Sequence, residues 1–99
     1  MIKNTLIIGC GLIGSSLLRA IAHQKISKKI FIYEKSKSNI SKIKKLKLPC
    51  TIIKNFKTVI PKLDLIIFCT PMSEYEKIIL KINNYLLPKT IITDVGSSK

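Results

Sequence analysis

The stretch LIIGCGLIGSSLLRAI, residues 6–21, constrains the fold more than any other part of the chain. A short apolar run enters three glycines, Gly9, Gly11 and Gly14, and an apolar pattern with helical spacing leaves them. Such a run is typical of a buried strand, and glycines permit a tight turn into the next element. The stretch therefore predicts a strand, a glycine turn and a helix in immediate succession.

The rest of the chain repeats this alternation of strand-like and helix-like patterns. Apolar, β-rich runs occupy residues 5–8, 30–33, 51–53, 65–69 and 91–94, and helical patterns occupy residues 12–23, 38–46 and 73–86. Ser73 and Glu76 form a capping box at the start of the third helical pattern, and Pro61 limits residues 55–62 to a short helix or turn. This alternation predicts an α/β fold with a doubly wound parallel sheet of about five strands in the order 3-2-1-4-5.

Length and charge narrow the class of protein. The 99 residues are 46% hydrophobic, enough for one small core, so we expect a single domain spanning residues 1–99. The net charge of +13 raises the alternative of a nucleic-acid or anion binder. The densest lysine segment, SKIKKLKL, interleaves apolar residues as an amphipathic helix would, and it carries no aromatic stacking platforms. We therefore favour a solvated lysine face and expect no nucleic-acid partner.

Nothing in the sequence predicts a membrane span, a signal peptide or a metal site. No apolar stretch approaches the ~20 residues that a bilayer requires, and the N-terminal residues lack a cleavage site. The three cysteines, Cys10, Cys50 and Cys69, are odd in number and lack metal-ligand spacing, and Cys69 follows an apolar run. We expect reduced structural cysteines, a buried Cys69, and a cytoplasmic protein with no membrane partner.

Gly9, Gly11 and Gly14 follow the spacing of a dinucleotide-binding turn, and an acid, Glu34, lies twenty residues beyond Gly14. The glycines would allow the turn, the close approach of a pyrophosphate and close helix packing, while Glu34 would accept hydrogen bonds from a ribose diol. The context predicts a Rossmann-type fold that binds a nicotinamide dinucleotide. Glu34 favours NAD, although Lys35 and Lys37 leave NADP open. The alternative is a tight turn that binds no ligand.

Ligands of such sheets lie beyond the carboxyl ends of the strands, so two further segments matter. After the fourth predicted strand comes CTPMSEYE, which places Thr70 and Pro71 in a loop facing the coenzyme. After the fifth comes TDVGSSK, at the end of the sequence.

Together, GCGLIGSSLLRAI, the CTP loop and LLPKTIITDVGSSK resemble the nucleotide-binding half of prephenate and arogenate (cyclohexadienyl) dehydrogenases of tyrosine biosynthesis. The resemblance implies an oxidoreductase of aromatic amino acid biosynthesis that transfers hydride from its substrate to NAD(P) as carbon dioxide leaves. It also implies that Ser97 is the active-site serine that contacts the substrate hydroxyl. The residues that it places against the coenzyme are Gly9, Gly11, Leu12, Ile13, Gly14, Glu34, Thr70 and Pro71.

The sequence also departs from this family. In the family a histidine on the next strand acts as general base, and a helical second domain binds substrate and forms the dimer. The only histidine here, His23, falls late in the first predicted helix, where we expect it on the surface. We therefore expect a truncated coenzyme domain that is inactive alone and meets prephenate or arogenate only if a substrate domain is supplied. An exposed sheet edge and uncovered apolar helix faces would make it poorly soluble or drive association, as a homodimer or with a helical domain. The alternative is a non-catalytic NAD(H)-binding module or a degenerate remnant.

Overall fold

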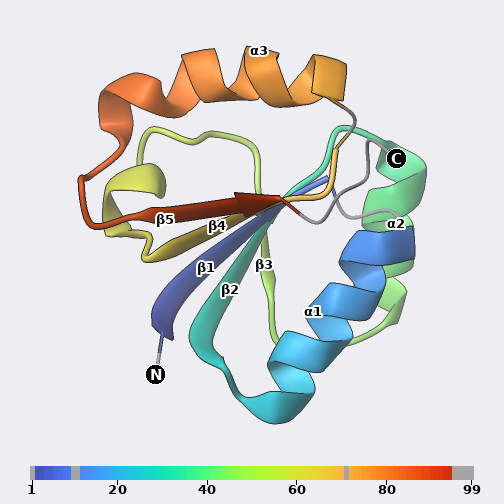
Figure 1. Ribbon diagram of the computed structural model, residues 1–99. Helices are drawn as coiled ribbons and strands as arrows, with labels where there is room; N and C mark the ends of the chain where they lie inside the picture. Colours follow the sequence, from blue (N-terminus) through green and yellow to red (C-terminus); the bar gives the residue numbers. More distant parts are fainter. Residues whose placement is uncertain (1, 10–11, 71, 95–99) are drawn as a thin grey trace.

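The computed structural model describes residues 2–9, 12–70 and 72–94. Within these residues the strands form one parallel sheet in the order β3-β2-β1-β4-β5, which confirms the predicted doubly wound arrangement (Figure 1). The strands are β1 (Ile2–Ile8), β2 (Ser27–Tyr33), β3 (Thr51–Ile53), β4 (Leu65–Phe68) and β5 (Ile91–Asp94). Because β1 is the central strand, the glycine turn leaves the sheet at its middle.

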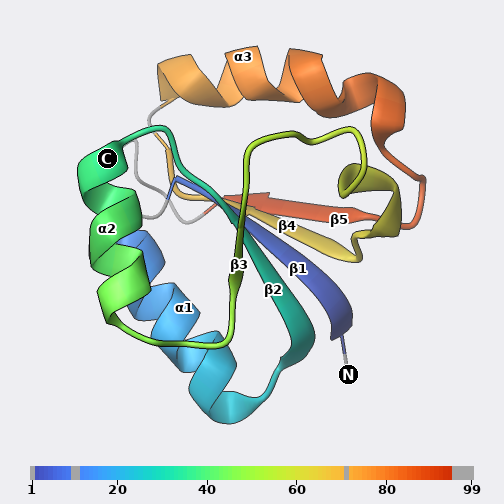
Figure 2. The ribbon, with the colours of Figure 1, turned by 180° about the vertical axis from the view of Figure 1, so that it is seen from behind.

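Helices cover both faces of this sheet. Figure 1 and the reverse view in Figure 2 show α1 (Leu12–Gln24) and α2 (Lys37–Lys45) on one face and α3 (Met72–Ile82) on the other. Residues 41–45 of the lysine-rich segment lie in α2, which ends at Lys45, with Ile43 buried and Lys42, Lys44 and Lys45 exposed to solvent. These lysines therefore form the solvent-exposed face of an amphipathic helix.

Alternation along the buried strands divides the core into two layers. Leu6 and Ile8 of β1 point to the face covered by α3, whereas Ile7 between them points to the face covered by α1 and α2. The first layer contains Leu6, Ile8, Phe56, Ile60, Leu63, Ile66, Phe68, Ile78 and Ile82. The second contains Ile7, Leu18, Ile21, Ile30, Ile32, Ile43 and Ile67. Residues 5–8 of β1 and 66–68 of β4 are therefore buried on both faces of the sheet, as expected for a parallel sheet.

Asp64, the residue before β4, forms hydrogen bonds that hold the amino ends of β1, β4 and β5 together. Its carboxylate accepts hydrogen bonds from the backbone N–H groups of Lys3 (3.2 Å) and Asn4 (3.0 Å) at the start of β1. Its backbone N–H donates to the carbonyl of Asn4 at 2.9 Å, and its carbonyl accepts from the N–H of Ile91 in β5 at 2.9 Å. The Asn4 hydrogen bond, with help from the Lys89 ammonium, holds the pKa of this carboxyl below its ordinary value.

The predicted elements are all present, with shifted ends. The helix predicted over 73–86 ends at Ile82 and continues as a 3-10 turn, η2 (Asn83–Tyr85), because two asparagines favour leaving an α-helix. The segment containing Pro61 is a turn followed by a 3-10 helix, η1 (Ile60–Lys62), as expected. The helix α3 begins at Met72, one residue before the predicted cap Ser73, whose side chain lies outside the described residues.

Within the described part of the chain, no helix has both the length and the apolar character needed to cross a bilayer.

Candidate functional site

The register of the sheet brings the carboxyl ends of its strands to one level. Ile8, the last residue of β1, pairs with Tyr33 at the end of β2 and with Phe68 at the end of β4. The residues that follow these strand ends therefore emerge side by side. Gly9, Glu34 and Thr70, which sequence reasoning selected from three separate segments, meet at this edge.

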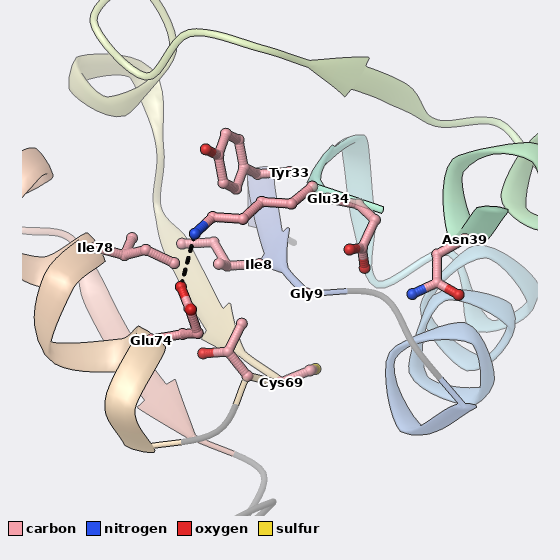
Figure 3. Close-up of a pocket in the computed structure, with 10 residues that line it drawn as sticks. Ile8, Gly9, Tyr33, Glu34, Asn39, Cys69, Glu74 and Ile78 are labelled. Atoms are coloured by element: carbon pink, nitrogen blue, oxygen red, sulfur yellow. Dashed lines mark hydrogen bonds and ion pairs between the residues drawn. The ribbon is translucent and has the colours of Figure 1, made fainter. Parts of the chain in front are cut away.

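These three residues line one pocket with a volume of about 320 Å³, shown in Figure 3. The walls come from the ends of β1 and β2, the residues after β4, the start of α2 and the first turns of α3. The lining residues are Ile8, Gly9, Tyr33, Glu34, Lys35, Asn39, Cys69, Thr70, Glu74 and Ile78. The pocket thus has an apolar floor, and the acids Glu34 and Glu74 and the lysine Lys35 lie at its walls.

Gly9 occupies a backbone conformation that explains why glycine is needed there. Its φ is +80°, a region that side-chain-bearing residues rarely adopt. A Cβ at this position would collide with the side-chain methyl of Thr70. The Gly9 N–H donates to the carbonyl of Tyr33 at 2.8 Å, and the Cys69 N–H donates to the carbonyl of Ile8 at 2.8 Å. The turn therefore fits tightly between the ends of β2 and β4. Because Gly9 has no side chain, room is left at the pocket floor.

Glu34 is held by the start of α2. Its carboxylate accepts a hydrogen bond from the Ser36 N–H at 3.0 Å, and the Ser36 hydroxyl caps α2 by accepting from the Asn39 N–H at 3.3 Å. Glu34 as a whole is half-buried. This arrangement places an oriented hydrogen-bond acceptor at the pocket wall, which is the chemistry that a ribose diol requires.

Lys35 forms an ion pair across the pocket with Glu74 in the first turn of α3. The Lys35 Nζ lies 2.8 Å from the Glu74 Oε2, and this contact is the dashed line in Figure 3. The hydrogen bond and the opposite charge of Lys35 lower the pKa of Glu74, and those of Glu74 raise the pKa of Lys35. Both groups therefore carry their charges at neutral pH. Sequence reasoning did not identify Glu74, because its partner lies 39 residues earlier.

Other residues selected from the sequence fall partly outside the described structure. Leu12, Ile13 and Gly14 form the first turn of α1, where a dinucleotide turn requires a helix start, but their side chains are not described. Gly11, Pro71 and the predicted catalytic Ser97 lie outside the described residues, as does Cys10.

Two predictions about single side chains have different outcomes. Cys69, predicted to be buried, is only half-buried, because it follows the end of β4 and lines the pocket. His23 is exposed in the last turn of α1, as expected, at the opposite end of that helix from the glycine turn. Among the described residues, no cluster of histidine, cysteine and acidic side chains could hold a metal ion.

Comparison with known proteins adds a family and a fold. The family model described as NADP oxidoreductase, coenzyme F420-dependent, matches residues 5–97. Two similar solved structures are dehydrogenases. One is the prephenate dehydrogenase from A. aeolicus with hydroxyphenyl propionate and NAD+, with a TM-score of 0.81 and 23% identity over 95% of this chain and 33% of that one. The other is Synechocystis arogenate dehydrogenase, with a TM-score of 0.73 and 21% identity over 94% of this chain and 32% of that one.

The same fold also occurs in a reductase of another substrate class. Plasmodium falciparum pyrroline carboxylate reductase with NADP bound has a TM-score of 0.70 and 22% identity over 98% of this chain and 36% of that one. At these identities the likeness establishes the fold alone. The chain spans about a third of the length of the solved structures it matches.

Proposed function

Since this chain belongs to the family described as NADP oxidoreductase, coenzyme F420-dependent, we propose that it is the dinucleotide-binding domain of a prephenate or arogenate dehydrogenase. Family and fold make it an NAD(P)-binding domain of the oxidoreductase class. The observation that carries the proposed site is the meeting of Gly9, Glu34 and Thr70 in one pocket at the carboxyl edge of the sheet. The choice of substrate rests on the resemblance of the closing TDVGSSK segment.

Each proposed coenzyme contact follows from the chemistry of the residue. Gly9 makes the tight turn out of β1, Gly11 would let a pyrophosphate approach the backbone, and the N–H groups at the start of α1 would face that pyrophosphate. The Glu34 carboxylate would accept hydrogen bonds from the adenosine ribose, and Thr70 with Pro71 would flank the nicotinamide side. Gly11, Leu12, Ile13 and Gly14 would complete the pyrophosphate turn.

The proposed reaction is an oxidative decarboxylation. When bound, the coenzyme would supply the hydride acceptor for the substrate ring as carbon dioxide leaves. Within this chain, Ser97 would contact the substrate hydroxyl near the transferred hydride. The general base and the substrate-binding residues would come from a helical domain, either joined to this domain or supplied as a partner, and this domain alone would bind coenzyme without turnover.

The pocket supports NAD, because the Glu34 carboxylate would repel a 2′-phosphate. One observation favours NADP as the second candidate coenzyme. A neighbouring hollow of about 550 Å³ also includes Glu34, and four lysines line it: Lys35, Lys37, Lys44 and Lys54. These ammonium groups could offset the repulsion of a phosphate, so the two coenzymes need a direct comparison.

Calorimetric titration of the purified chain with NADH and NADPH tests the binding proposal, with Glu34→Ala as the matched variant. Saturable NADH binding that weakens at least tenfold in Glu34→Ala would support the site, since charge-assisted hydrogen bonds to ribose would be lost, about 1.5–3 kcal/mol. A folded chain that binds neither coenzyme would overturn it.

Exchange of domains tests the substrate class. We would replace the matched domain of the A. aeolicus prephenate dehydrogenase with this chain and follow prephenate-dependent NADH formation. Turnover that falls in the Ser97→Ala version of the chimera would support the proposal. A chimera that binds NAD+ normally but gives no turnover with prephenate or arogenate would favour the alternative of a non-catalytic NAD(H)-binding module or a remnant.

A further inference from the structure

We propose that Glu74 is a specificity-determining residue of the dinucleotide site. It holds the Lys35 ammonium on the α3 side of the pocket, away from Glu34, and thereby weakens the binding of a 2′-phosphorylated coenzyme relative to an unphosphorylated one. The inference rests on the proposed placement of the adenosine ribose beside Glu34.

The geometry separates two charges that are adjacent in sequence. Lys35 directly follows Glu34, yet its Nζ lies 2.8 Å from the carboxylate of Glu74. Figure 3 shows Glu34 and Glu74 on opposite sides of the pocket, with Glu34 beside Asn39 and Glu74 beside Ile78. The Lys35 side chain therefore spans the pocket and presents its charge to α3.

A 2′-phosphate placed beside Glu34 would need cations nearby to offset the repulsion of that carboxylate. Lys37, Lys44 and Lys54 line the neighbouring hollow, and the Lys35 ammonium would add to them if it turned toward Glu34. Lysine carries its charge on a flexible four-carbon stem and can serve as a phosphate ligand from several directions. Lys35 could turn toward Glu34, but such a movement would break its pair with Glu74. Glu74 thus competes with the phosphate for the same ammonium group.

The surroundings of Glu74 favour its pairing with Lys35. Lys77 and Lys81 on α3 also stabilise the Glu74 carboxylate, although they contribute less than the direct hydrogen bond from Lys35. The pair is partly exposed, with side-chain exposures of 57% for Lys35 and 32% for Glu74. Solvent screens such a contact, so the effect on coenzyme choice should be modest and should decline with added salt.

The test measures the ratio of the dissociation constants of NADPH and NADH in four forms of the chain. Glu74→Gln removes the charge that holds Lys35 while keeping the shape of the side chain. Glu76→Gln removes the same charge from an exposed position of α3 that does not line the pocket. The double variant Glu74→Gln with Lys35→Met removes the released ammonium as well. Thermal unfolding verifies that each variant is folded.

In Glu74→Gln the NADPH-to-NADH ratio of dissociation constants should fall about two- to fivefold, the range of a partly exposed charge contact. It should return to the unmodified value or above in the double variant and change less than half as much in Glu76→Gln. Binding of both coenzymes with an unchanged ratio in Glu74→Gln would overturn the role of Glu74 alone. An equal fall in Glu76→Gln would overturn it too, as a general effect of charge. Binding of neither coenzyme by the unmodified chain would instead overturn the proposed function.

Discussion

Gly9 and Thr70 lie so close together that a single added carbon on Gly9 would collide with the Thr70 methyl. Gly9 follows the central strand β1, and Thr70 follows its neighbour β4, so the contact joins the two loops at the carboxyl edge of the sheet. The positive φ of Gly9 and its hydrogen bond to Tyr33 fix the turn from the other side. The pocket floor is therefore set by the absence of a side chain at one position.

Gly9→Ala should destabilise the chain by about 1–3 kcal/mol, because alanine would have to adopt a left-handed backbone and displace the Thr70 methyl. It should also weaken NADH binding. Urea unfolding and calorimetry would measure the two effects. Thr70→Ser, which removes the methyl and keeps the hydroxyl, should restore part of the loss in the double variant. A double variant no more stable than Gly9→Ala would show that backbone strain alone accounts for the cost.

Thr5→Val should leave stability unchanged or raise it by about 1 kcal/mol. Thr5 is fully buried in β1, and within the described residues no hydrogen-bond partner lies within reach of its Oγ1. Valine has nearly the same shape and no hydroxyl to desolvate. The midpoint of urea unfolding would measure the change. A loss above 1 kcal/mol would mean that the hydroxyl has a partner in solution, such as a bound water.

Asp64→Asn should reduce the pH dependence of unfolding. The pKa of Asp64 is lowered in the folded chain, so its contribution to stability is present above the unfolded value, about pH 4, and is lost as the pH falls through the folded value. The unmodified chain should therefore lose stability below about pH 4, and the variant should show a shallower decline. Thermal midpoints between pH 2.5 and 7, on the order of five points, would give both curves.

The exposed acid Glu76 provides the control for this experiment. Comparison of Asp64→Asn with Glu76→Gln separates the loss of one negative charge from the loss of the Asp64 contacts. If Asp64→Asn and the unmodified chain lose stability in parallel, the hydrogen bonds from Lys3 and Asn4 do not depend on the charge of the carboxylate.

Ile43→Ala should cost about 2–4 kcal/mol, the range for truncating a fully buried aliphatic side chain. Ile43 is 1% exposed and is the buried residue through which α2 packs on the second core layer. Chemical denaturation would measure the loss. Ile40→Ala, at a half-buried position of the same helix, is the matched control and should cost less than half as much. Equal losses would contradict the packing of α2 through Ile43.

The position of α2 also bears on the site, because its first residues hold the Glu34 carboxylate through Ser36. Loosening α2 with Ile43→Ala should therefore weaken NADH binding more than Ile40→Ala does. Equal affinities in the two variants would mean that the loop after β2 holds Glu34 independently of α2.

The sequence by itself determined the order of strands and helices and the place of the glycine turn. Apolar runs and amphipathic patterns are local signals, and a parallel alternation of strand and helix leaves few topologies, so the order 3-2-1-4-5 could be predicted. Gly9 could also be identified from a local signal, because a strand that turns directly into a helix needs a residue that tolerates positive φ. The spacing to Glu34 then located the other end of the pocket.

The tertiary structure decided which residues of distant segments contact one another at the carboxyl and amino edges of the sheet. Lys35 and Glu74 are 39 residues apart, and Asp64 binds the backbone of Asn4 from 60 residues away. Cys69 is half-buried because β4 ends before it, and it packs against the second core layer. Such contacts depend on how far each strand extends and how each helix crosses the sheet. Those quantities are fixed by packing between distant segments, for which local sequence patterns carry no signal.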